Sequence, residues 1–143
     1  MLKEFELRLM AQDELNAVNA LAVKEDMPPL DSAEGVTLAV SPEGQIVGYI
    51  HVLPGADGAM HVQSLASDSD WRGIGVGRAL IEQAYDQHHD LRLVARGSAV
   101  GFYQKLGYHE VPWKDIDFNV SDDCYSCEIR DTCHPLPMRK ERA

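Results

Sequence analysis

The chain has 143 residues, a length that fits one domain with a sizeable core and needs neither disulfides nor a metal for folding. Its 13 Lys and Arg residues against 23 Asp and Glu give a formal net charge of −10 at pH 7. This charge argues against nucleic acid and anionic membrane surfaces as partners. It is compatible with cationic substrates, and it could also serve solubility alone. Because the apolar runs are too short to span a membrane and the first residues lack the features of a signal peptide, we expect a cytoplasmic protein.

The first half of the chain predicts a strand, a helix and three further strands. Glu4–Met10 alternates apolar and charged residues, as in a half-buried outer strand. Ala11–Asp26 carries apolar residues at helical spacing and ends before two prolines. Val36–Val40, Ile46–Leu53 and Ala59–Ser67 are expected strands, and the Pro- and Gly-containing turns between them are typical of an antiparallel meander.

The second half predicts an alternation of helices and strands. A helix is expected from Gly77 to about His88, a strand over Leu91–Ala95, a helix over Ser98–Leu106 and a strand over Tyr108–Trp113. A strand–helix–strand unit implies a parallel pair with a right-handed crossover. The expected fold class is therefore α/β: a mixed, mostly antiparallel sheet flanked by helices, in a single domain over residues 1–143.

A glycine-rich turn lies directly before the helix that begins near Gly77. Its sequence is Arg72-Gly73-Ile74-Gly75-Val76-Gly77-Arg78. Glycines let the backbone approach a ligand, and the first turn of a helix presents N–H groups that have no intrahelical partner and favour negative charge. The Gly-Lys-Ser/Thr ending of a Walker loop is absent, and the third glycine and acidic partner of a Rossmann motif are not cleanly present. The turn predicts an anion site. Its setting indicates a cofactor different from the nucleotides that Walker and Rossmann motifs bind.

Two segments together resemble a known family. Arg72–Gly77 is similar to the Arg/Gln-x-x-Gly-x-Gly/Ala motif of the GCN5-related N-acetyltransferases (GNAT), and Ala99–Tyr108 resembles their second hallmark. The resemblance implies the GNAT-like acyl-CoA N-acyltransferase fold along nearly the whole chain. It also implies transfer of an acetyl group from acetyl-CoA to an amine of a small molecule or peptide, by direct attack in a ternary complex.

The resemblance also implies which residues bind acetyl-CoA. The pyrophosphate would lie on backbone N–H groups of Gly73–Arg78, and the pantetheine arm would run alongside Leu65 and Ser67 as if extending the sheet. Arg72 and Arg78 could add charge or form ordinary salt bridges. The expected cofactor-binding residues are Leu65, Ala66, Ser67, Arg72, Gly73, Ile74, Gly75, Val76, Gly77, Arg78 and Phe102.

The catalytic residues implied by the resemblance are Tyr103 and His61. Tyr103 is at the family's position for a general acid, and a neutral phenol can protonate a departing thiolate, although Phe102 and Tyr103 could simply pack under their helix. His61 is where some members carry a glutamate that acts as a base through water. A structural histidine is the alternative, and His51 on the adjacent strand is a competitor for the base.

Three further positions bear on the same site. Gln63, expected on the face of His61, could position a substrate, and the backbone N–H near Leu65 would hold the oxyanion. Where family members frequently have Asn before the second helix this chain has Arg96, which puts that polar contact to the cofactor in doubt. A CoA-binding regulatory, metal-binding or partner-binding module without efficient catalysis is the alternative function.

The three cysteines lie close together near the end of the chain. Cys124, Cys127, Cys133 and His134 have spacings close to those of short zinc sites, and they form an atypical loop at 120–134. His134 also begins a segment that resembles the last strand of related acetyltransferases, so its side chain need not join the cysteines. Free thiols and a redox-active pair are the other interpretations, and no metal is assigned.

The acceptor is the least defined partner. The segment 110–131 contains seven acidic residues against two cations, and it would favour a cationic small molecule or peptide amine if it borders the acceptor cleft. A solvated loop explains the same residues. A homodimer is also compatible with the sequence.

Overall fold

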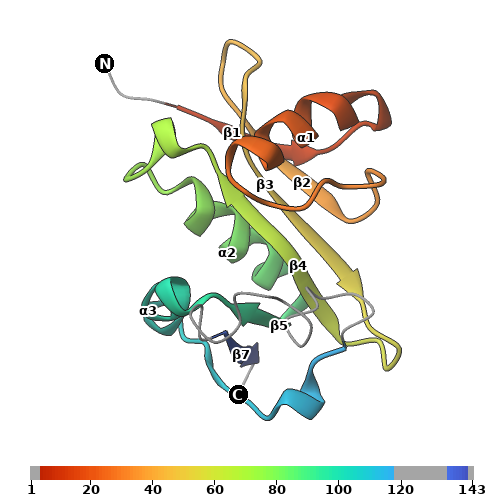
Figure 1. Ribbon diagram of the computed structural model, residues 1–143, viewed down its shortest axis with the longest axis vertical. Helices are drawn as coiled ribbons and strands as arrows, with labels where there is room; N and C mark the ends of the chain where they lie inside the picture. Colours follow the sequence, from red (N-terminus) through yellow and green to blue (C-terminus); the bar gives the residue numbers. More distant parts are fainter. Residues whose placement is uncertain (1–3, 118–134, 142–143) are drawn as a thin grey trace. The chain divides into compact units, whose positions relative to one another are not determined.

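The computed structural model describes residues 4–117 and 135–141, and the described chain contains a mixed sheet and three α-helices (Figure 1). The sheet has the strand order β1-β2-β3-β4-β5-β7-β6. Its strands are β1 (Glu6–Leu9), β2 (Val36–Val40), β3 (Ile46–Pro54), β4 (Met60–Ser67), β5 (Asp90–Ala95), β6 (His109–Glu110) and β7 (Leu136–Glu141). The helices are α1 (Leu15–Lys24), α2 (Val76–His88) and α3 (Val100–Lys105).

Strand directions agree with the expected fold class. The pairs β1/β2, β2/β3, β5/β7 and β6/β7 are antiparallel, and β4 pairs with β5 in parallel through His61 and Arg92. The parallel pair is the one expected on either side of the helix that follows the glycine turn. The prediction of an α/β fold with a mixed, mostly antiparallel sheet is confirmed.

The described residues divide into two compact units. The first unit comprises residues 4–52 and 64–84, and the second comprises residues 53–63, 85–117 and 135–141. Strand β4 contributes its first half to the second unit and its second half to the first. The single domain expected over 1–143 stays a prediction.

The core of the first unit forms between α1 and one face of its strands. Val18 and Leu21 of α1 are buried with Leu38 of β2 and Tyr49 of β3 in one apolar cluster. The helix follows a 3₁₀ turn (Gln12–Glu14), where the Glu14 side chain accepts the Ala11 N–H at 2.9 Å. The expected helix over Ala11–Asp26 is confirmed as this turn followed by α1.

The other face of β3 receives the start of α2. A Cβ built on Gly48 would lie 2.6 Å from Cγ1 of Val76 and 3.0 Å from the carbonyl oxygen of Ala66. Side chains alternate across a strand, so Gly48 faces away from the α1 core that holds Tyr49. Glycine at 48 therefore lets the first turn of α2 lie directly against the strand.

In the second unit, β7 pairs with β5 over six residues of each strand. The pairing is reinforced at one end by Arg139, whose guanidinium donates to both carboxylate oxygens of Asp90 at 3.0 and 2.6 Å. This ion pair lowers the pKa of Asp90, with the hydrogen bond from Arg139 as the main cause. The segment that resembles the last strand of related acetyltransferases forms β7 from Leu136 onward.

One predicted strand is too long. The expected strand Tyr108–Trp113 is only His109–Glu110 in the structure, followed by a 3₁₀ turn at Trp113–Asp115. Val111 still donates its N–H to the carbonyl of Pro137 at 3.0 Å, but Pro112 has no N–H to continue the ladder. The correction follows from this proline.

No helix among the described residues is long and apolar enough to cross a membrane. The cytoplasmic location expected from the sequence stays a prediction. The loop at 120–134, with its three cysteines and His134, lies outside the described residues, so the interpretations given for it also stay open.

Candidate functional site

The turn before α2 has the geometry that its glycines predict. Gly73 and Gly75 have φ of +79° and +94°, in the left-handed region that side chains disfavour. The first helical hydrogen bond runs from the N–H of Ala79 to the carbonyl of Gly75 at 2.9 Å. The N–H groups of Val76, Gly77 and Arg78 therefore have no intrahelical acceptor, and they carry the positive end of the helix dipole.

Gly77 differs from the two glycines before it. It lies within α2, it has no positive φ, and a Cβ built on it would meet no atom of the described residues within 4 Å apart from its chain neighbours and the backbone of its own helix. Neither backbone conformation nor packing explains a glycine there, although glycine in a helix costs about 0.5–1 kcal/mol relative to alanine. Open space beside an exposed helix start suits close approach of a ligand.

The remaining cofactor-binding candidates of the first unit differ in how they could contact a ligand. Val76 and Ala66 are buried at 2% and 5% exposure, so only their backbone atoms could take part. Leu65, Ser67 and Ile74 are half-buried.

The two arginines of the motif are exposed and paired with carboxylates. Arg78 donates through Nε to Oε1 of Glu82 at 2.9 Å, one helical turn away, and Nη2 of Arg72 lies 3.9 Å from Oε1 of Glu25. Both arginine side chains are more than half exposed. Their present partners are therefore those of ordinary surface salt bridges.

Tyr103 lies in α3 of the second unit and is 8% exposed. Burial raises the pKa of its phenol to about 12, so the phenol is protonated at neutral pH. Its ring packs at 71° to Phe102, with centroids 5.1 Å apart, and at 69° to Tyr108, with centroids 5.6 Å apart. Phe102 is 38% exposed, so this aromatic group has one buried and one accessible member beside each other on α3.

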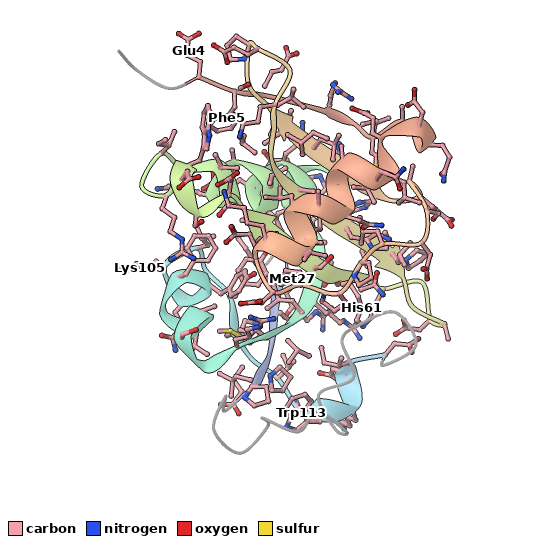
Figure 2. All side chains as sticks on the ribbon, turned by 45° about the horizontal axis from the view of Figure 1, so that its top comes forward. Glu4, Phe5, Met27, His61, Lys105 and Trp113 are labelled. Carbon is pink, nitrogen blue, oxygen red and sulfur yellow. The ribbon has the colours of Figure 1, made fainter. Side chains whose placement is uncertain are left out.

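His61 is labelled in Figure 2 and lies on β4, also in the second unit. Its side chain is fully buried. Nδ1 lies 2.8 Å from the carbonyl oxygen of Ala59, and a carbonyl can only accept, so Nδ1 carries the hydrogen. Nε2 then accepts the backbone N–H of Asp117 at 3.0 Å. Both nitrogens of this neutral ring are engaged with backbone groups.

The same histidine belongs to a network around the turn between β3 and β4. Oδ2 of Asp117 accepts the N–H of Ala56 at 2.8 Å, and the carbonyl of Ala59 also accepts the N–H of Gly55 at 2.8 Å. A polar cavity of about 370 Å³ borders His61 and Arg92, whose Nη1 donates to the carbonyl of Asp115 at 2.8 Å. Sequence reasoning missed Asp117, because nothing local marks it as a partner of a residue 56 positions earlier.

His51, the competing candidate, lies on β3 in the first unit. It is 7% exposed, and its Nδ1 has no hydrogen-bond partner in the part of the chain that the structure describes. Burial lowers the pKa of the imidazole, against the opposing influence of Glu34 and Asp31. Gln63, on β4, is half-buried.

Within residues 4–117 and 135–141, no three His, Cys, Asp or Glu side chains are grouped so that they could hold a metal ion. The cysteines are not among these residues, so the zinc interpretation is not tested by this observation.

Residues 33–110 match the model of the acetyltransferase (GNAT) domain. The peptidyl-lysine N-acetyltransferase YjaB of Escherichia coli is 35% identical over 83 residues, which cover 56% of this chain and 53% of that protein. An uncharacterised N-acetyltransferase of Chlorobaculum tepidum is 25% identical over 103 residues, covering 68% and 65%. The chain thus spans about half to two thirds of these curated relatives.

Solved structures share the fold. Rv2747 of Mycobacterium tuberculosis, in complex with CoA, superposes with a TM-score of 0.76 at 12% identity, over 96% of this chain and 99% of that one. Ard1 of Thermoplasma volcanium gives a TM-score of 0.71 at 18% identity, over 95% and 96%. The family model covers more than half of the chain, so the protein belongs to the GNAT acetyltransferase family, as its two sequence motifs predict.

Proposed function

We propose that the protein is an acetyl-CoA-dependent N-acetyltransferase. The observation that carries this proposal is the start of α2, where N–H groups without an intrahelical acceptor, two glycines with positive φ and the open space beside Gly77 would form a backbone cradle for a pyrophosphate. Membership of the GNAT family and the CoA complex of a structural neighbour support the same cofactor. Acetyl-CoA acts as a co-substrate that brings the acetyl group.

The second half of β4 is the proposed contact for the pantetheine arm. Leu65 and Ser67 alternate with the buried Ala66, so the strand has a less buried face next to the glycine turn in sequence. An amide-bearing arm can pair with strand N–H and C=O groups as an added strand would. Phe102, exposed on α3, is proposed as an apolar contact for the same cofactor.

The reaction is direct attack of a neutral amine on the thioester carbonyl. The nitrogen forms the new C–N bond, the carbonyl oxygen takes the negative charge near the N–H of Leu65, and the C–S bond then breaks. Tyr103 gives its phenolic proton to the departing thiolate, and its raised pKa keeps that proton in place throughout the neutral range. The proton lost by the amine passes to a base.

His61 is the base that the family resemblance implies, acting through water. For that role Nε2 would have to exchange the Asp117 N–H for a water molecule, because both nitrogens are engaged in the structure. Because both ring nitrogens bond to backbone groups, the structure supports a structural role for His61, holding Ala59 and Asp117 in place, more directly than a role as a base. This bonding is also the observation that favours the alternative function, a CoA-binding module with weak catalysis.

The acceptor is proposed to be an amine of a small molecule or a peptide. The peptidyl-lysine acetyltransferase among the relatives supports a lysine side chain as one candidate, and the net charge of −10 is compatible with a cationic acceptor. The cytoplasmic location and a homodimer remain proposals of the same kind.

The test combines cofactor binding with turnover. Calorimetry with coenzyme A, ATP and NAD should show binding of coenzyme A alone, and thiol release from acetyl-CoA should accelerate with at least one member of a panel of lysine peptides, polyamines and small amines. Binding of coenzyme A without acceleration by any amine would favour the weakly catalytic module. Preference for ATP or NAD would overturn the proposal.

A further inference from the structure

The C-terminal end of α1 is attached to the segment that leads from β4 into the glycine turn. Nζ of Lys24 donates to Oδ1 of Asp68 at 2.7 Å and to Oδ2 of Asp70 at 2.9 Å. The next residue, Glu25, accepts the N–H of Ser69 through Oε2 at 3.1 Å. We call these contacts of Lys24 and Glu25 with Asp68, Ser69 and Asp70 the α1 clamp; all of its residues belong to the first unit.

Asp68 is the centre of the α1 clamp. It is 3% exposed, and its Oδ1 accepts the N–H of Asp70 at 2.9 Å in addition to the ammonium of Lys24. Its own N–H donates to the carbonyl of Val47 on β3 at 2.8 Å, and its carbonyl accepts the N–H of Trp71 at 2.8 Å. One buried residue thus joins α1, β3 and the 3₁₀ turn at Ser69–Trp71.

Charge explains why the buried Asp68 pairs with Lys24. A buried carboxylate that loses its cationic partner is strongly destabilised, because little solvent is available to replace the ammonium. The hydrogen bond to Asp68, followed by the one to Asp70, raises the pKa of Lys24, so its side chain stays charged at neutral pH. The Lys24 side chain is 43% exposed, so it can be substituted without opening the core.

The position of the α1 clamp in the chain connects it to the cofactor cradle. Asp70 is followed by the buried Trp71, then by the exposed Arg72 and the turn at Gly73 and Gly75. Those glycines are conformationally free, so the direction in which the turn leaves the sheet depends on what holds the residues before it. The side-chain contacts of the α1 clamp hold those residues to the end of α1.

We propose that Lys24 and Asp68 are positioning residues for coenzyme A. They contact no atom of the cofactor; they hold segment 68–70 so that the N–H groups at the start of α2 point at the pyrophosphate. This inference rests on the proposed function, because it concerns the same cofactor site.

The chain offers a matched control at the other end of α1. Arg8 donates to both carboxylate oxygens of Glu14 at 2.7 and 2.6 Å, and Glu14 also accepts a backbone N–H before the helix. This pair belongs to the same unit and supports the same helix, but it is remote in sequence from the glycine turn. Glu14→Gln should therefore lower stability without changing cofactor affinity.

The experiment measures the Kd for coenzyme A by calorimetry and the thermal midpoint for Lys24→Gln, Lys24→Arg, Asp68→Asn and Glu14→Gln. We expect Asp68→Asn and Lys24→Gln to raise Kd about tenfold, because small displacements of positioned groups weaken the contacts they make. Lys24→Arg should recover most of the affinity, since it keeps the cation. With acetyl-CoA, the variants should change KM more than kcat.

Electrostatics alone gives a different pattern. The Asp70 side chain is 78% exposed, so its carboxylate contributes mainly charge. If the negative charge near the cradle decided affinity, Asp70→Asn would tighten binding of coenzyme A as much as Lys24→Gln weakens it. Positioning predicts no tightening for Asp70→Asn, because this variant weakens one contact of the α1 clamp, the one with Lys24, and adds none. A tightening of that size would overturn the positioning role.

The inference also fails if Lys24→Gln and Asp68→Asn bind coenzyme A as tightly as wild type while their thermal midpoints fall like that of Glu14→Gln. Should Asp68→Asn not fold, the exposed substitution Lys24→Gln decides the question on its own. Absence of coenzyme A binding in the wild-type protein would instead reject the proposed function and, with it, the role of the α1 clamp.

Discussion

The glycine turn of the first unit and the Tyr103–His61 region of the second differ in which atoms would act. The turn offers backbone N–H groups at the start of α2. It depends on positive φ values at Gly73 and Gly75, which glycine adopts more easily than other residues. The second region offers side chains, a buried phenol and a buried imidazole. In the first case the residue types determine the geometry directly, and in the second the surroundings determine what each side chain can do.

The two side chains of the second unit illustrate that dependence. Tyr103 is buried in an aromatic group, and its raised pKa favours the protonated state that a general acid needs. His61 is buried too, but its hydrogen-bonding capacity is used by Ala59 and Asp117. Burial therefore supports the proposed role of the first residue and weakens that of the second.

The largest effect is expected for Tyr103→Phe. Removing a general acid lowers turnover by about 10²–10⁴-fold, and the ring should still pack against Phe102 and Tyr108. Steady-state kinetics should show the fall in kcat, while calorimetry should show an unchanged Kd for coenzyme A. Tyr85→Phe, which also removes a phenol from this unit, is the control and should keep kcat. An unchanged kcat in Tyr103→Phe would mean that the side-chain region contributes packing alone.

The next effect concerns His61 and separates a brace from a base. His61→Ala leaves the N–H of Asp117 without its acceptor, which should lower the free energy of unfolding by about 1–3 kcal/mol. In His61→Gln, the side-chain oxygen can accept that N–H but cannot act as a base. Urea unfolding and kcat measured together decide between the two roles.

If His61 is a brace, the glutamine variant should recover stability and activity relative to alanine. If it is the base, the glutamine variant should be as slow as the alanine variant although it is more stable. The second outcome would return His61 to the catalytic role that the family resemblance implies.

Fold prediction from the sequence succeeded where local pattern and tertiary context agree. The bounds of β2 are those expected, because a short, mostly apolar run there is closed by a turn containing Pro42 and Gly44. It failed at Tyr108–Trp113, where a strand was expected over the whole segment and Pro112 ended the ladder. The proline was visible in the sequence, so that error was avoidable.

Prediction of the site was limited by the distance along the chain between the residues that form it. The glycine turn could be located because its signal lies within a few consecutive residues. The α1 clamp could not, since Lys24 and Asp68 are 44 positions apart and each is an ordinary charged residue in its own segment. In the structure the Asp68 side chain caps the 3₁₀ turn at Ser69–Trp71, and nothing in the sequence of that segment indicates that a lysine of α1 is its partner.

A smaller effect is expected on alkaline stability. In the unfolded chain Tyr103 ionises near its ordinary pKa of 10.0, whereas in the folded chain its pKa is about 12. Between these values the unfolded state releases the proton first, so rising pH favours unfolding, by on the order of 3 kcal/mol once both states are ionised. The contribution is fully present below pH 10.

Urea unfolding from neutral pH upward should show this decline, and Tyr103→Phe should make it shallower. Burial raises the pKa of Tyr108 as well, so part of the decline should remain in the variant. Equal alkaline slopes in the two proteins would show that the phenol of Tyr103 is more accessible in solution than the structure indicates.

The smallest change in stability, and the one that tests the backbone site most directly, is expected for Gly77→Ala. Alanine fits the helical backbone, and among the described residues its Cβ would approach only its chain neighbours and its own helix, so it should raise the free energy of unfolding by about 0.5–1 kcal/mol. The added methyl group would occupy the space that the pyrophosphate needs, so the Kd for coenzyme A should rise several-fold. Gly101→Ala on α3, where a Cβ is equally unobstructed, is the matched control and should leave Kd unchanged. A more stable protein that binds less cofactor would show that the glycine is retained for the ligand, whereas a stable variant with unchanged Kd would place the cofactor away from this turn.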